Sequence, residues 1–99
     1  MEIDGGLIGA PVVDGSGRRI GEAAGILVDP YSLHVGWLLV AMMGGGEAVV
    51  PATATSANAA GQLVVPFDAA MVAGAPTLVG EVITSELAAA LRAFYGLSG

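Results

Sequence analysis

The residues that could carry out catalysis are few and widely separated in this 99-residue sequence. His34 is the single histidine, so a cluster of histidine metal ligands is excluded. A catalytic triad would have to join His34 to one of the scattered serines, and none of these lies in a Gly-x-Ser-x-Gly turn. The absence of cysteine removes thiolate zinc sites, iron–sulfur clusters and cysteine nucleophiles. We therefore expect no catalytic residue, no metal and no cofactor, and interpret His34 as structural or exposed.

One segment resembles a phosphate-binding loop, but its context favours a turn. The run from Gly15 to Gly21 is similar to a dinucleotide fingerprint, yet its last glycine comes one residue late and a strand is expected to follow. A Walker loop needs a lysine, which the sequence lacks. We interpret Arg18 and Arg19 as the solvated tip of a hairpin.

The charge balance excludes several classes of partner. Nine acidic residues face three arginines, which gives a net charge of −6. Nucleic acids and anionic membrane surfaces attract basic patches, so neither is an expected partner. The acidic residues are spread singly, with no pair spaced as in a glycosidase dyad or a calcium loop. No apolar run approaches the ~20 residues of a membrane helix, and the acidic N-terminus differs from a signal peptide, so we expect no membrane insertion and a cytoplasmic location.

The elements that would position these residues are mainly β-strands. Runs of β-branched residues alternate with short turns rich in glycine, proline and aspartate, a pattern typical of an antiparallel meander. The expected strands cover five ranges: Pro11–Val13, Arg19–Val28, His34–Met43, Glu47–Val50 and Gln62–Val65. The stretch from Ala52 to Gly61 is interpreted as a small-residue loop with room for one helical turn.

Two helices are expected after the strands. Asp68 is suited to cap a short helix over Ala69–Ala73. Thr84 or Ser85 would cap a longer helix that runs to about Tyr95. The apolar residues of this second helix recur at helical spacing: Leu87, Leu91 and Phe94 or Tyr95. We therefore expect it to lie on the sheet or on another chain.

The third expected strand is apolar on both faces. Trp37, Leu39 and Met43 fall on one face, whereas Leu38 and Val40 fall on the other. One face must pack in the interior, and the other must be covered by the C-terminal helix, by a loop or by a second copy of the chain. The sequence leaves these alternatives open. If the first face points outward, Trp37, Leu39 and Met43 form a candidate interaction surface, with ordinary core packing as the alternative.

A series of short motifs runs along nearly the whole chain, from about Leu7 to Gly96. Its clearest members are Ile8-Gly9-x-Pro11-Val12-Val13-Asp14, Leu27-Val28-Asp29, Val35-x-Trp37-Leu38-Leu39-Val40, Val49-Val50-Pro51, Val64-Val65-Pro66 and Ile83-Thr84-x-Glu86. In order and spacing this series resembles the PRC-barrel domain family. That family includes the cytoplasmic part of the photosynthetic reaction centre H subunit and the C-terminal domain of a ribosome maturation factor. The resemblance implies a small, partly open β-barrel that acts as a protein-interaction module without catalytic residues.

These observations predict one domain over residues 1–99. Its expected fold is all-β, a small, partly open antiparallel meander barrel with a short helix and a C-terminal amphipathic helix. The expected function is a non-catalytic protein-interaction or assembly module that is homodimeric and has an unidentified protein partner. A chain this short buries a limited core, which makes pairing of two copies a natural source of stability. The alternatives are a small-ligand carrier that uses the barrel mouth and, least favoured, an enzyme of unrecognised type.

Overall fold

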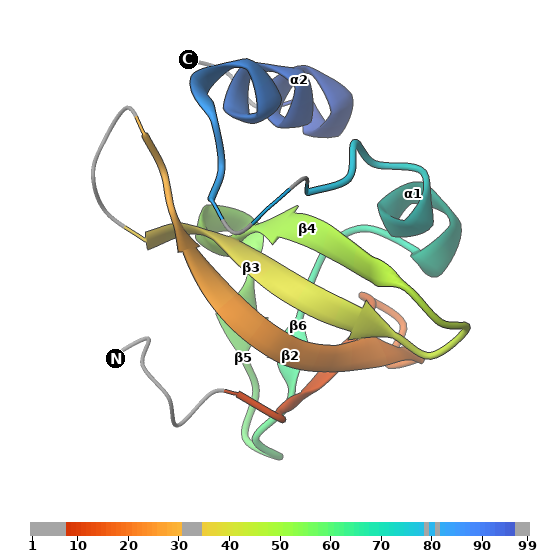
Figure 1. The fold of residues 1–99 in the computed structure, drawn as a ribbon. Helices are drawn as coiled ribbons and strands as arrows, with labels where there is room; N and C mark the ends of the chain where they lie inside the picture. The colour runs from red at the N-terminus through yellow and green to blue at the C-terminus, as the bar shows by residue number, and fades with distance from the viewer. Residues whose placement is uncertain (1–7, 31–34, 79, 81, 97–99) are drawn as a thin grey trace.

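The computed structural model describes residues 8–30, 35–78, 80 and 82–96, which form a curved sheet flanked by two α-helices (Figure 1). The strands are β1 (Pro11–Val13), β2 (Arg19–Val28), β3 (Val35–Met42), β4 (Glu47–Pro51), β5 (Ser56–Ala57) and β6 (Leu63–Val64). The helices are the short 3-10 helix η2 (Ala52–Ala54) and the α-helices α1 (Ala69–Ala73) and α2 (Ser85–Tyr95). The predicted sheet-dominated class with two short helices is confirmed. His34, the expected start of the third strand, lies outside the described residues.

The sheet has the strand order β4-β3-β2-β1-β6-β5. From β1 to β4 the strands pair antiparallel in chain order, as the meander prediction requires. The prediction of a wholly antiparallel sheet is wrong, because β1 pairs with β6 in parallel, with Val12 opposite Leu63. A parallel neighbour needs a long connection, and here the entire meander between β1 and β6 supplies it. The described strands therefore form a mixed sheet with β4 and β5 as its edges.

Strand β2 is the longest strand of the sheet. It bends where its pairing with β3 is interrupted. The register with β3 shifts between Ala23 and Gly25 and again between Leu27 and Val28. Such bulges bend a strand and increase its twist. Near the start of β2, a Cβ on Gly21 would lie 2.2 Å from the carbonyl oxygen of Ala41, so only glycine lets the two backbones approach this closely.

The hairpin between β1 and β2 is organised by the Asp14 carboxylate. Its Oδ1 accepts hydrogen bonds from the Ser16 hydroxyl at 2.7 Å, the Arg18 amide at 2.9 Å and the Ser16 amide at 3.0 Å. These bonds stabilise the charged form, so the Ser16 hydroxyl and then the Arg18 amide lower the pKa of Asp14. Gly17 supplies the positive φ of 91° that the turn needs.

Both α-helices begin at the residues expected to cap them. An Asp68 carboxylate oxygen accepts from the Met71 amide at 2.8 Å, and the Thr84 hydroxyl accepts from the Leu87 amide at 3.1 Å. These contacts satisfy backbone donors that the first turn of a helix leaves without partners. At the other end of α2, Gly96 adopts a left-handed conformation with φ 70°.

The stretch from Ala52 to Gly61 holds more structure than the predicted loop. Its one helical turn is η2, and after it β5 pairs with β6, with Ser56 opposite Val64. The Thr55 hydroxyl donates to the Pro51 carbonyl at 2.9 Å across η2. Small exposed residues carry little strand propensity of their own, so the pairing of β5 depends on β6 lying beside it.

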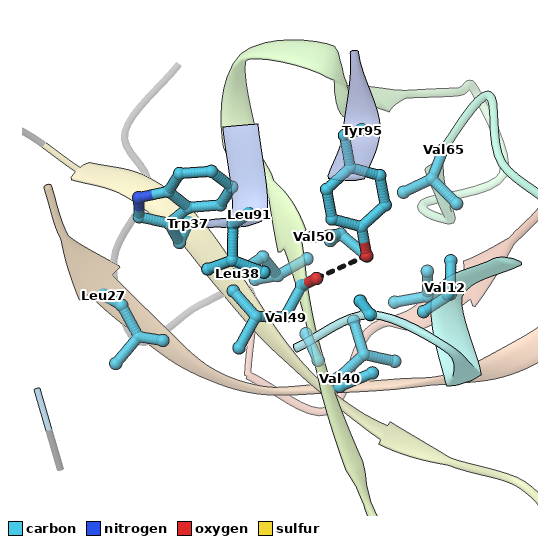
Figure 2. Packing of buried hydrophobic residues seen from close by; sticks show 14 of the residues in the cluster. Val12, Leu27, Trp37, Leu38, Val40, Val49, Val50, Val65, Leu91 and Tyr95 are labelled. Carbon is cyan, nitrogen blue, oxygen red and sulfur yellow. Dashed lines mark hydrogen bonds between the residues drawn. The ribbon is translucent and has the colours of Figure 1, made fainter. Parts of the chain in front are cut away.

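Valines dominate the core, and α2 contributes to the same cluster. Figure 2 shows Val12, Val40, Val49, Val50 and Val65 packed together, and all five are fully buried. Helix α2 adds three buried side chains to this cluster: Ala88, Leu91 and Tyr95. The predicted apolar face of α2 is thus present, and it packs on the sheet of its own chain.

Tyr95 joins α2 to an edge of the sheet. Its hydroxyl donates to the backbone carbonyl of Val49 in β4 at 2.6 Å (Figure 2). Its ring lies 4.6 Å from the ring of Phe67, which follows β6. The same side chain therefore contacts edge strand β4 and the segment after β6. Burial raises the pKa of Tyr95 to about 12.

Candidate interaction surface

Trp37, the centre of the interaction surface expected from the sequence, lies in the core. Its side chain is 2% exposed and lies beside Leu91 of α2 (Figure 2). The guanidinium carbon of Arg92 is 5.8 Å from the centre of the Trp37 ring, a distance suited to a cation–π contact. Among the described residues, the buried indole Nε1 finds no hydrogen-bond partner. The structure thus removes Trp37 from any exposed surface.

The other two residues of the expected surface are placed differently from Trp37 and from each other. Leu39 is half-buried against the core cluster, whereas Met43 is 68% exposed just beyond the end of β3. The three residues therefore do not form one exposed patch. They follow a gradient in which burial decreases from Trp37 toward the β3–β4 hairpin.

The cover of β3 comes from within the chain over its first half. Trp37, Leu38 and Val40 are all buried, although they belong to both faces of the strand. Helix α2 packs in the same cluster as these residues. Of the alternatives left open by the sequence, intramolecular cover applies to this part of the strand. The apolar side chain that stays exposed at the other end of this strand is Met43, next to the hairpin.

An open hollow of about 570 Å³ lies beside the β3–β4 hairpin. Its apolar lining combines the start of β2, the end of β3 and one side of α1: Ile20, Met42, Met43, Ala69, Ala70 and Ala73. The alanines are short, so they leave space above α1 where longer side chains would fill it. Methionine is flexible and polarisable, and it adapts to partners of different shape. The hollow is thus suited to receive an apolar side chain.

Backbone hydrogen bonds fix the two methionines between neighbouring strands. The Met43 amide donates to the Ile20 carbonyl at 3.1 Å, and the Met42 amide donates to the Gly46 carbonyl at 3.0 Å. The hairpin itself consists of glycines, and a Cβ on any of Gly44 to Gly46 would find no atom within 4 Å. This lip of the hollow is therefore open to solvent.

Opposite charges flank the methionines. Arg19 belongs to β2 and Glu47 to β4, the strands on either side of β3, and both line the hollow. Both residues are exposed, and no ion pair joins them to each other. The hollow thus has a positive side, an apolar centre and a negative side.

A second polar cluster lies at the far end of β3 and has a structural role. Arg92 of α2 forms a salt bridge with Asp29, which follows β2 and is 5% exposed. A Cβ on Gly36 would lie 2.7 Å from the Asp29 Cβ, so the glycine makes room for the aspartate. This pair attaches the last turn of α2 to the sheet.

The sequence predicted only part of the hollow and did not predict the Asp29–Arg92 pair. Met43 belongs to the interaction surface expected from the sequence, but the contribution of Ala69 and Ala73 carries no local signal. The Asp29–Arg92 pair joins residues 63 positions apart, which no periodicity reveals. In residues 8–30, 35–78, 80 and 82–96, no three histidine, cysteine, aspartate or glutamate side chains gather closely enough to hold a metal ion.

Comparison with known proteins leaves the family of the chain open. No family model matches the sequence, and no curated protein matches it. Within the described residues, no helix combines the length and apolar character needed to cross a membrane. The hollow and its surroundings therefore provide the structural basis for a function.

Proposed function

We propose that this chain is a non-catalytic protein-interaction and assembly module of the PRC-barrel type that acts as a homodimer. The observation that carries the proposal is the exposed methionine at the hollow: Met43 is large, apolar and 68% exposed beside an apolar recess. An exposed apolar side chain beside an apolar recess offers an adaptable surface for association. The antiparallel run from β1 to β4 supports the PRC-barrel resemblance.

The packed interior favours assembly over transport of a ligand inside the sheet. The valines at the centre of the cluster are fully buried in one hydrophobic cluster, which supports an interior occupied by side chains rather than by a cargo. Binding energy must then come from the outer surface. The hairpin hollow supplies an apolar centre with a polar rim, which is the usual anatomy of a protein interface.

Light scattering after size-exclusion chromatography tests the proposal. A homodimer has twice the 9.7 kDa mass of the chain, and we expect this mass at micromolar concentration. A mass of one chain at high micromolar concentration would contradict homodimer formation.

A small-ligand carrier is the second candidate function. The volume of the hollow, about 570 Å³, lies within the ~300–1,000 Å³ range of small-molecule sites. Native mass spectrometry of the purified protein separates the candidates. A stoichiometric small-molecule adduct would favour the carrier, and a bare dimer would favour the assembly module.

A further inference from the structure

We propose that the hairpin hollow is one half of a two-fold interface, in which Met43 of each copy enters the hollow of the other. This inference rests on the proposed homodimer and specifies its surface. Three observations carry it: the exposure of Met43, the apolar recess next to it and the opposite charges of Arg19 and Glu47. In a two-fold dimer the same patch serves both chains, so it must be complementary to itself.

The shape of the patch meets this requirement. Met43 is a protruding side chain, and the hollow beside it is a recess between the hairpin and α1. Ala69 and Ala73 give the recess a low wall, against which an incoming methionine would pack. A protrusion next to a recess allows two copies to exchange side chains reciprocally.

The charges meet the same requirement. A two-fold axis that runs parallel to β3, between Met43 and the recess, also passes between Arg19 and Glu47, and it places Arg19 of each copy opposite Glu47 of the other. The two chains then form two ion pairs across the apolar centre. Because each copy has a net charge of −6, long-range repulsion opposes association, and matched local charges select the arrangement in which the copies meet.

The first experiment places a charge at the centre of the patch. In the Met43→Glu variant a carboxylate would have to enter the apolar recess, so we expect the mass in solution to fall from two chains to one. Val82→Glu is the matched control, because Val82 is also 68% exposed but lies outside the lining of the hollow. We expect the Val82→Glu protein to stay dimeric. Circular dichroism confirms that both variants are folded.

The second experiment exchanges the charges. The R19E chain presents two carboxylates at the patch, and the E47R chain presents two guanidinium groups. Each variant alone is expected to be monomeric, since like charges would meet across the axis. When the two are mixed in equal amounts, every ion pair is matched again, and a dimer that contains one chain of each kind should form. Native mass spectrometry resolves this mixed dimer.

The outcomes separate this surface from the proposed function. A mixed dimer from two monomeric variants supports the interface. If the wild-type chain is dimeric and the Met43→Glu, R19E and E47R chains stay dimeric, the chain assembles through another surface and this inference is wrong. If the wild-type chain is monomeric, both the homodimer and the inferred surface are contradicted.

Discussion

The Tyr95 hydroxyl donates to the Val49 carbonyl at 2.6 Å and thereby joins the end of α2 to edge strand β4. Strand edges carry backbone groups that can pair with other chains. Tyr95 occupies one of these groups and covers it with an aromatic ring. The helix therefore has two roles, to complete the core and to protect the edge.

Replacement of Tyr95 by phenylalanine tests the hydrogen bond while the ring is kept. The substitution leaves the buried Val49 carbonyl without its hydroxyl donor, so we expect the free energy of unfolding to fall by about 1–2 kcal/mol. Urea denaturation followed by circular dichroism measures this loss, with the denaturant slope unchanged. A variant as stable as the wild type would show that the bond adds nothing to folding.

The alkaline stability of the protein should depend on the same hydroxyl. Its pKa is about 12 in the folded chain, above the ordinary value of 10.0 that applies when the chain is unfolded. The stabilisation is complete below pH 10, and it is lost as the pH rises from 10 through 12, because the unfolded state releases the proton first. The sequence contains no lysine to titrate in this range.

The difference in free energy of unfolding between the wild type and Tyr95→Phe isolates the contribution of the Tyr95 hydroxyl to the pH dependence of stability. We expect the stability gap between the two proteins to narrow above pH 10 in denaturation measured at successive pH values. A gap that stays constant from pH 8 to 11.5 would contradict the raised pKa.

Substitutions of Asp29 and Arg92, which form a salt bridge, should have strongly coupled effects on stability. Arg92→Leu removes the guanidinium group from an aspartate whose side chain is 7% exposed, so we expect the free energy of unfolding to fall by about 2–3 kcal/mol. Addition of Asp29→Asn should restore part of this loss, since the buried negative charge that Arg92 had balanced is then removed. Additive effects in the double-mutant cycle would show that the two residues act independently.

Trp37, the single tryptophan, gives the salt bridge a spectroscopic readout. Arg92 lies over the Trp37 ring, so Arg92→Leu should change the fluorescence emission of the folded protein. Asp29→Asn, which leaves the guanidinium group in place, is the matched comparison.

Gly21 should not tolerate a larger residue. A Cβ at this position meets the Ala41 carbonyl oxygen at 2.2 Å, and we expect Gly21→Ala to cost about 1–3 kcal/mol through displacement of β3. Gly15→Ala is the control, because a Cβ on Gly15 finds no atom within 4 Å. Equal melting temperatures for the two variants would show that the strands separate without cost.

Trp37→Glu should unfold the domain, whereas Met43→Glu should not. Truncation of a buried tryptophan alone costs about 3–5 kcal/mol, and a buried carboxylate adds to this, against a total stability of about 5–15 kcal/mol for a small domain. Far-ultraviolet circular dichroism distinguishes the two proteins. A folded Trp37→Glu protein would contradict the buried position of Trp37.

The sequence predicted elements wherever local chemistry marks their ends. The bounds of β1, β2 and α1 agree with the prediction, because turn residues or a capping aspartate flank them. The direction of Trp37 could not be predicted, since both faces of β3 are apolar and a period of two cannot tell inside from outside. The parallel pairing of β1 with β6 depends on contacts between distant segments.

The candidate site was predictable only in part for the same reason. Met43, which lines the hollow, was part of the interaction surface expected from the sequence together with Trp37 and Leu39. One wall of the hollow is α1, whose alanines resemble those of any short helix until packing places them beside the hairpin. The sequence does not show that Arg19 and Glu47 lie on either side of β3. That arrangement follows from the strand order of the folded sheet.

The bond between Tyr95 and Val49 also sets an order of events during synthesis. The two residues are 46 positions apart, and β4 is synthesised before α2. At about 5–20 residues per second, roughly 2–9 s pass between the synthesis of Val49 and that of Tyr95. Throughout this interval the β4 edge and the apolar surroundings of Trp37 lack their helix. The nascent chain thus passes through a stage in which it is more prone to aggregation than the finished protein.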